Sequence, residues 1–236
     1  MNNVLSIEEF FSFIEKSSSL RLKLLSDLNT ITNNDSLDQS IRFHHIRSNI
    51  PTLYSQYEGF TKDIFNTIPL FLSSIDKSIN LDNVYLSLHI ACSLFYKKES
   101  SFYNYISAIN TSLNSFFEES TTYFSDYNPG TIVVPHNDKL YVFFELFNFN
   151  TEIINKFKLI NTKIKTYYKR RNSIIHGSIT ESNSSEFYLI EEFDSTHLIK
   201  SLMLWNEQYE FTKDIINLLR ESTFSWAQEN FLTNQL

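Results

Sequence analysis

The 236-residue chain is poor in the residues that interrupt regular backbone, with only 3 Gly and 4 Pro. Glycine supplies the positive φ angles of tight hairpins and phosphate-binding loops, and proline ends or kinks helices. So few of both leave little material for hairpins, Gly-rich phosphate loops or a barrel, and they favour long helices. We therefore predict an all-α fold.

Cysteine is almost absent too. The single Cys92 excludes an internal disulfide framework and a multi-cysteine zinc site. The chain also has no Gly-x-Ser-x-Gly, no P-loop and no His-Glu-x-x-His, so serine-hydrolase, NTPase and zinc-protease functions have no support. The adjacent His44 and His45 would point about 100° apart on a helix and would share one metal ion poorly. We expect no metal or other cofactor.

The chain lacks a membrane-length apolar run and a basic leader. The longest uncharged apolar stretch near the middle, residues 83–96, contains Asn, Ser and His and is too short and too polar to span a bilayer. Residues 1–10 carry Glu8 and Glu9 and no basic residue, which does not match a secretory signal. Because 42% apolar and 16% aromatic residues are ample for a core, we expect a folded, soluble, cytoplasmic protein.

Apolar residues recur at helical spacing along much of the chain. After Ser6, a residue suited to the N-cap, the spacing predicts a helix from Ile7 to about Leu28, ended by the polar residues 33–36. A second pattern from Leu37 to about 75 contains two prolines, so it is either two helices or one with kinks. Further helices are predicted at residues 80–96, 101–117, 138–147, 151–176 and 195–228, and short extended segments at 131–135 and 186–192.

Residues 127–130, Tyr-Asn-Pro-Gly, are the clearest turn signal and the one tempting domain boundary. The amphipathic helices on either side would lack partners if the two halves folded alone. We therefore expect one helical domain over residues 1–236.

Charge is unevenly distributed along the chain. The net charge of −7 argues against a protein that coats nucleic acid. Between Ile153 and Thr180, however, there are seven Lys and Arg and no carboxylate; the other 13 cations face all 27 Asp and Glu, a balance of −14. This run is either a solvated helix face or a local site for a polyanion, and its density favours the second interpretation.

The apolar spacing of the 151–176 helix predicts which side faces inward. The stripe consists of Phe157, Ile160, Ile164, Tyr167 and Ile174. Arg171 falls on the same stripe, and a buried arginine needs an acceptor, either a carboxylate or a bound phosphate. Lys163, Lys169 and Arg170 lie off the stripe and are expected to be solvated.

Polar groups suited to phosphate chemistry gather at the end of this helix. Asn172 and His176 are four residues apart, so their side chains are neighbours on one face beside Arg171. Gly177 suits the left-handed position that follows a helix, and the dipole at this end favours a protonated imidazole. A cation for phosphate, an amide to position it and a histidine that titrates near neutral pH are the groups that metal-independent RNA cleavage requires.

Two segments resemble a known superfamily. Residues 171–177, Arg-Asn-Ser-Ile-Ile-His-Gly, resemble the R-N-x-x-x-H-G form of the Arg-x4-6-His signature of HEPN proteins, which include many ribonucleases of bacterial toxin and antiphage systems. Residues 54–63, Tyr-Ser-Gln-Tyr-Glu-Gly-Phe-Thr-Lys-Asp, resemble the "Y-E-G-F" helix upstream in stand-alone conflict-system members. The segments occur in the expected order, and the resemblance implies a HEPN-like bundle of long kinked helices over most of the chain.

The resemblance also implies roles for individual residues. Arg171 would stabilise charge on the scissile phosphate, and His176 would act as general base on the RNA 2′-hydroxyl or general acid at the leaving 5′-oxygen. Asn172 would orient the phosphate or the histidine. Glu58 would either pair with Arg171 or join the active site, and Tyr57 would support it.

The resemblance further implies partners. Arg170, Lys169 and Lys165 would bind RNA, and two chains would form a homodimer whose motifs face one cleft. The predicted function is a metal-independent endoribonuclease, a toxin or antiphage effector with an antitoxin or defence-system protein as a further partner. HEPN domains also occur as inactive modules, so the alternative is a module that binds RNA or nucleotide, dimerises, or docks on a partner protein.

Overall fold

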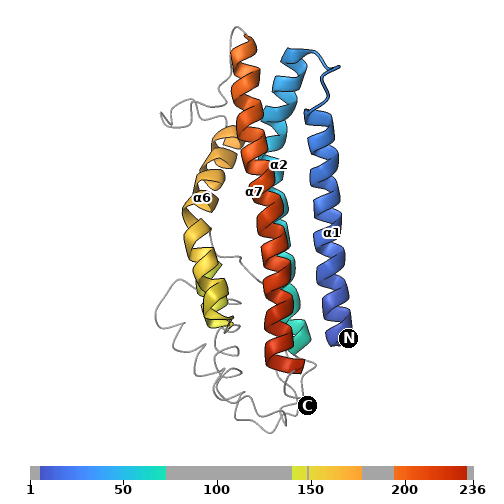
Figure 1. Ribbon diagram of the computed structural model, residues 1–236, viewed down its shortest axis with the longest axis vertical. Helices are drawn as coiled ribbons and strands as arrows, with labels where there is room; N and C mark the ends of the chain where they lie inside the picture. Colours follow the sequence, from blue (N-terminus) through green and yellow to red (C-terminus); the bar gives the residue numbers. More distant parts are fainter. Residues whose placement is uncertain (1–5, 73–139, 148, 177–193, 233–236) are drawn as a thin grey trace. The chain divides into compact units, whose positions relative to one another are not determined.

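The computed structural model describes residues 6–72, 140–147, 149–176 and 194–232 (Figure 1). They form α1 (Ile7–Thr32), α2 (Gln39–Leu72), α5 (Leu140–Leu146), α6 (Thr151–His176), α7 (Ser195–Ala227) and a π-helical segment, Gln228–Leu232. Of these residues 92% are helical and none lies in a strand, which confirms the predicted all-α class. Within the described helices, none has the length and hydropathy needed to cross a bilayer.

Helix positions agree closely with the sequence pattern. The bounds of α6 are those predicted, α1 extends to Thr32, and α7 ends one residue before the predicted Gln228. The span that left one or two helices open is a single helix, α2, with Pro51 in its interior. The elements expected at 80–96, 101–117, 131–135 and 186–192, and the turn at 127–130, lie outside the described residues.

Side chains that precede the helices satisfy their first N–H groups. The Ser6 Oγ accepts a hydrogen bond from the Glu9 main-chain N (3.2 Å), and the Glu9 carboxylate accepts one from the Ser6 N (2.8 Å). This reciprocal pair is a capping box and confirms Ser6 as the N-cap of α1. Asp38, Asn150 and Asp194 accept comparable bonds at the starts of α2, α6 and α7.

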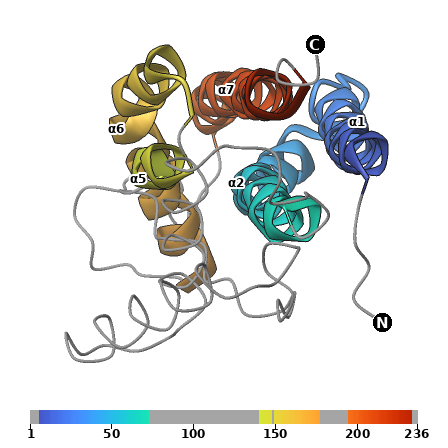
Figure 2. The ribbon, with the colours of Figure 1, turned by 90° about the horizontal axis from the view of Figure 1, so that it is seen from below.

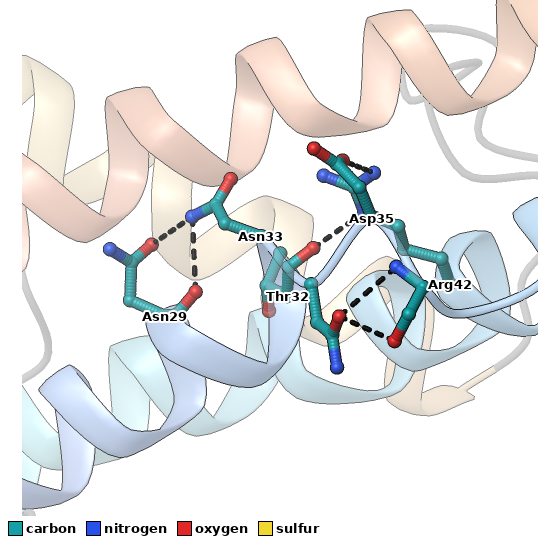
Figure 3. A network of polar contacts seen from close by, with 7 residues as sticks. Asn29, Thr32, Asn33, Asp35 and Arg42 are labelled. Carbon is teal, nitrogen blue, oxygen red and sulfur yellow. Dashed lines mark hydrogen bonds and ion pairs between the residues drawn. The ribbon is translucent and has the colours of Figure 1, made fainter.

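The turn between α1 and α2 is fixed by polar contacts (Figure 3). Arg42 donates from Nε to the main-chain oxygen of Thr32 (2.6 Å) and from a terminal nitrogen to Asp35 (2.6 Å). The Asn33 side chain donates to the main-chain oxygen of Asn29 (3.0 Å). The Arg42 bonds satisfy the Thr32 carbonyl at the end of α1 and hold the start of α2 against the end of α1. The Asn29 carbonyl also accepts a hydrogen bond from the Asn33 main-chain N (3.0 Å).

The chain divides into two compact units. Unit 1 contains residues 1–15, 61–161 and 221–236, and unit 2 contains residues 16–60 and 162–220. Each unit draws on parts of α1, α2, α6 and α7, so neither is one continuous segment of chain. The single-domain organisation stays a prediction.

The core of unit 1 is aromatic. Phe144 of α5 stacks on Phe157 of α6, with ring centroids 4.3 Å apart, so these helices lie side by side (Figure 2). Trp226 of α7 stacks on Phe149 at 5.3 Å and donates its indole N–H to the main-chain oxygen of Phe147 (2.8 Å). The hydrogen bond satisfies the polar edge of a tryptophan that is otherwise enclosed by rings.

The core of unit 2 combines apolar packing with polar ties between helices. Trp205 of α7 is fully buried and donates its indole N–H to Asn29 of α1 (2.9 Å). Tyr167 of α6 donates its hydroxyl to Glu207 of α7 (3.1 Å). Unit 2 holds most of both segments that carry the resemblance, namely residues 54–60 of α2 and 171–176 of α6.

Candidate active site

The basic run of α6 is partly neutralised by carboxylates from outside it. Three lysines form ion pairs: Lys156 with Glu152 (2.8 Å), Lys158 with Glu145 (2.6 Å) and Lys163 with Glu207 (3.4 Å). All three pairs are exposed, so each contributes little to stability. They nevertheless reduce the excess charge in the first half of the run. Lys163 and Lys169 are exposed as predicted, and Lys165 is exposed as well.

Arg171 is half-buried rather than fully inward. A terminal nitrogen of its guanidinium donates to the Asn172 side-chain oxygen (2.8 Å), which orients the group. Its Nε is buried and makes no hydrogen bond. Within the described part of the chain, no carboxylate forms an ion pair with Arg171. Among the described residues, the printed partner of its guanidinium is thus a neutral amide, so an anion that binds Arg171 would form a strong charge-assisted hydrogen bond.

Tyr54 connects the two resembling segments. Its ring, on α2, lies 5.9 Å from that of Tyr168 on α6. Burial is the main cause that raises the pKa of Tyr54 far above its usual range; the negative charge of Glu58 adds to this and the positive charge of Arg171 opposes it. Glu58 and Arg171 thus both lie within electrostatic reach of one neutral phenol, and the structure brings the two segments together around it.

Tyr57 and Glu58 differ in their surroundings. Tyr57 is only 6% exposed and meets Tyr54 edge-on at 5.6 Å; its supporting role at the site stays a prediction. Glu58 is half-buried. Of the two roles left open for it, direct pairing with Arg171 is not observed among the described residues. The two charges instead act on Tyr54 from different helices.

The prediction that Arg170 is solvated is wrong. Arg170 is 8% exposed, donates to the Gln208 side-chain oxygen of α7 (3.1 Å) and lies over the Tyr167 ring at 5.3 Å. Positions three and four after Tyr167 both fit a helical stripe, and the sequence pattern selected the second, Arg171. Arg170 is the buried residue, because the buried amide of Gln208 supplies the acceptor that a buried guanidinium needs.

His176 is the last residue of α6, as predicted. Its side chain and Gly177 lie outside what the structure describes. Asn172 is half-buried and uses its oxygen to hold Arg171, so it positions the cation; a role toward the histidine stays a prediction.

A contact between α1 and the 54–60 segment of α2 was not predicted from the sequence. The Arg21 guanidinium of α1 lies against Gly59 and donates to the side chain of Gln56 (3.2 Å). A Cβ atom built on Gly59 would lie 2.6 Å from an Arg21 nitrogen, so only glycine admits the group at this distance. The available signal was the glycine itself, because glycine inside a helical pattern marks close packing.

Comparison with known proteins identifies the family of the chain. The model of the RiboL-PSP-HEPN family matches residues 16–223, a span that includes both the α2 and the α6 segments. None of the curated proteins and none of the solved structures gives a significant match. HEPN proteins generally include ribonucleases, typically bind RNA and often dimerise. Since the match covers most of its length, the chain belongs to the RiboL-PSP-HEPN family of HEPN proteins.

Proposed function

We propose that the protein is a metal-independent endoribonuclease that acts as a toxin or antiphage effector. The observation that carries this proposal is the state of Arg171: a half-buried guanidinium, oriented by Asn172, without an ion-paired carboxylate in the described residues, in the last turns of the helix that ends at His176. A cation preorganised in this way suits the charge that develops on a phosphate during cleavage.

The reaction is an attack of the RNA 2′-hydroxyl on the adjacent phosphorus. A bond forms between the 2′-oxygen and phosphorus while the bond to the 5′-oxygen of the next nucleotide breaks. A general base removes the 2′ proton and a general acid protonates the leaving 5′-oxygen. The products are a 2′,3′-cyclic phosphate and a 5′-hydroxyl. Arg171 would stabilise the additional negative charge that the phosphoryl oxygens carry in the transition state.

Each chain offers one His176, whereas the reaction needs both a base and an acid. A homodimer with two facing motifs would supply two imidazoles, one neutral and one protonated, at the same phosphate. This arrangement predicts a bell-shaped dependence of kcat on pH. Lys165 and Lys169, which are exposed on α6, would contact phosphates that flank the scissile one and would add to affinity more than to kcat.

Cleavage assays in EDTA on wild type and two variants test the proposal. Arg171→Ala is expected to lower kcat by a factor on the order of 10²–10³, as for removal of a charge-stabilising donor, and His176→Ala by a factor on the order of 10²–10⁴. The matched control is Lys156→Ala, which removes a cation from the same basic run, at an exposed ion pair, and should retain kcat. Induction of wild type in cells should arrest growth, and induction of the two motif variants should not.

The alternative, an inactive module, predicts a different set of results. Purified wild type would then bind RNA or nucleotide without cutting it, and the three variants would affect cells in the same way as wild type. Growth arrest that persists in both motif variants, with RNA intact, would remove the nuclease assignment.

A further inference from the structure

A buried polar pair lies directly beside the motif, on the α6 side that faces α7. Arg170 is 8% exposed and Gln208 is fully buried. The Arg170 terminal nitrogen donates to the Gln208 side-chain oxygen at 3.1 Å, and its guanidinium also covers the Tyr167 ring. A charge buried to this degree is costly unless its geometry is well satisfied, so the pair constrains the end of α6 strongly.

Gln208 extends the constraint to a third helix. Its side-chain nitrogen donates to the main-chain oxygen of Ile50 in α2 at 3.3 Å. A guanidinium only donates and a carbonyl only accepts, so the amide of Gln208 has one orientation that serves both partners. Ile50 lies one helical turn before Tyr54, the residue that packs on Tyr168 of α6. Helices α2, α6 and α7 are therefore locked together on one face of the site.

These hydrogen bonds fix how α6 is rotated about its own axis. Consecutive side chains on an α-helix diverge by about 100°, so fixing Arg170 against α7 fixes the direction in which Arg171 leaves the helix. That direction brings Arg171 within electrostatic reach of Tyr54, the phenol that Glu58 also influences. A small rotation of the last turns of α6 would release Arg170 from Gln208 and displace Arg171 from the site together.

We infer that Arg170 and Gln208 form a positioning pair that sets the orientation of Arg171, and that Arg170 is not an RNA contact. The inference rests on the proposed nuclease function, because orientation of Arg171 matters to the reaction only if Arg171 meets the scissile phosphate. It assigns to Gln208, a residue of α7 outside both motifs, a role in turnover. Arg170 acts through Arg171 and does not touch the substrate.

The test uses the full chain with Arg170→Met, Gln208→Met and the double variant. The double variant replaces both polar partners with apolar side chains of similar length, a change that is often near neutral for folding. Each single variant and the double variant should lower kcat by a similar factor, on the order of tenfold to a hundredfold, with KM nearly unchanged. Arg170→Lys, which keeps a donor toward Gln208, should recover most of the lost kcat, and Lys156→Met is the matched control on the same helix.

Other outcomes overturn the inference. If Arg170 contacts RNA, Arg170→Met raises KM and reduces the salt dependence of binding, while Gln208→Met leaves kcat and KM as in wild type. If the pair only stabilises the fold, the melting temperature falls while kcat per folded molecule is retained. If the losses in the two single variants multiply in the double variant, the residues do not act as a unit.

A readout that needs no activity separates this inference from the proposed function. The Nε–H resonance of Arg171, assigned by its disappearance in Arg171→Lys, should shift or broaden in the folded double variant and stay in place in Lys156→Met. An unchanged Arg171 resonance in the double variant overturns the positioning role. If wild type cleaves no RNA but the Arg171 resonance still shifts or broadens in the double variant, the proposed function is overturned and the positioning role of the pair stands.

Discussion

Replacing Gly59 with alanine tests how α1 fits against the upstream segment of α2. In an ordinary helix interior this substitution stabilises the folded state by about 1 kcal/mol, because alanine loses less backbone entropy than glycine. At Gly59 the added Cβ would lie 2.6 to 3.0 Å from three atoms of the Arg21 guanidinium. The Arg21 guanidinium must therefore shift, and we expect this shift to break its hydrogen bond to the Gln56 side chain (3.2 Å).

The size of the effect follows from these two contributions. A hydrogen bond from a charged donor contributes about 1.5–3 kcal/mol, which exceeds the helix-propensity gain. Gly59→Ala should thus lower the free energy of unfolding by about 1 kcal/mol in the wild-type background. In an Arg21→Ala background the obstacle is gone, and the same substitution should raise the free energy of unfolding by about 1 kcal/mol.

Urea unfolding of the four proteins, followed by far-UV circular dichroism, measures this cycle. The expected coupling between Gly59 and Arg21 is about 2 kcal/mol. If Gly59→Ala stabilises both backgrounds equally, Arg21 does not pack against Gly59 in solution and the structural reason given for this glycine is incorrect.

Two further predictions concern the fold around the site. Trp226→Phe keeps a ring against Phe149 but removes the donor to the buried Phe147 carbonyl, so thermal or urea unfolding should show a loss of about 2–3 kcal/mol; a loss below a few tenths would contradict the hydrogen bond. A hydrogen bond from the Thr196 side chain is the main cause that lowers the pKa of Asp194 at the start of α7. A lowered folded-state pKa adds stability above the ordinary pKa of 3.8 that is lost as the pH falls through the folded value. Wild type should therefore exceed Asp194→Asn in stability at neutral pH, with the difference shrinking on acidification below pH 3.8; a difference independent of pH would contradict the cap.

Much of the helical framework could be predicted from the sequence because its signals are local. The Ser6 cap, the polar residues 33–36 and the spacing of apolar side chains mark where α1 begins and ends without reference to any other helix. The same applies to α6, whose predicted bounds are those observed. The motif residues at its end were recognised from their order along the chain, which is also a local property.

The side of α6 that is buried could not be predicted in the same way. Positions 170 and 171 are both arginines, and both fit the spacing that follows Tyr167. Which of them is buried depends on Gln208, 38 residues further along the chain on a different helix. The contact of Arg21 with Gly59 is likewise set by packing between helices. Helical periodicity identifies the buried face of a helix to within about one residue, and contacts with the neighbouring helix determine which residue is buried.

We propose above all that the protein cleaves RNA through the 2′-hydroxyl without a metal. The most direct measurement is cleavage, in EDTA, of an RNA oligonucleotide containing a mapped cut site, beside the same oligonucleotide with one 2′-deoxy nucleotide immediately 5′ of that phosphate. We expect the all-ribose strand to yield a 2′,3′-cyclic phosphate and a 5′-hydroxyl, and the single 2′-deoxy substitution to abolish the cut. Cleavage that persists at the substituted position, leaving a 3′-hydroxyl and a 5′-phosphate, would contradict it.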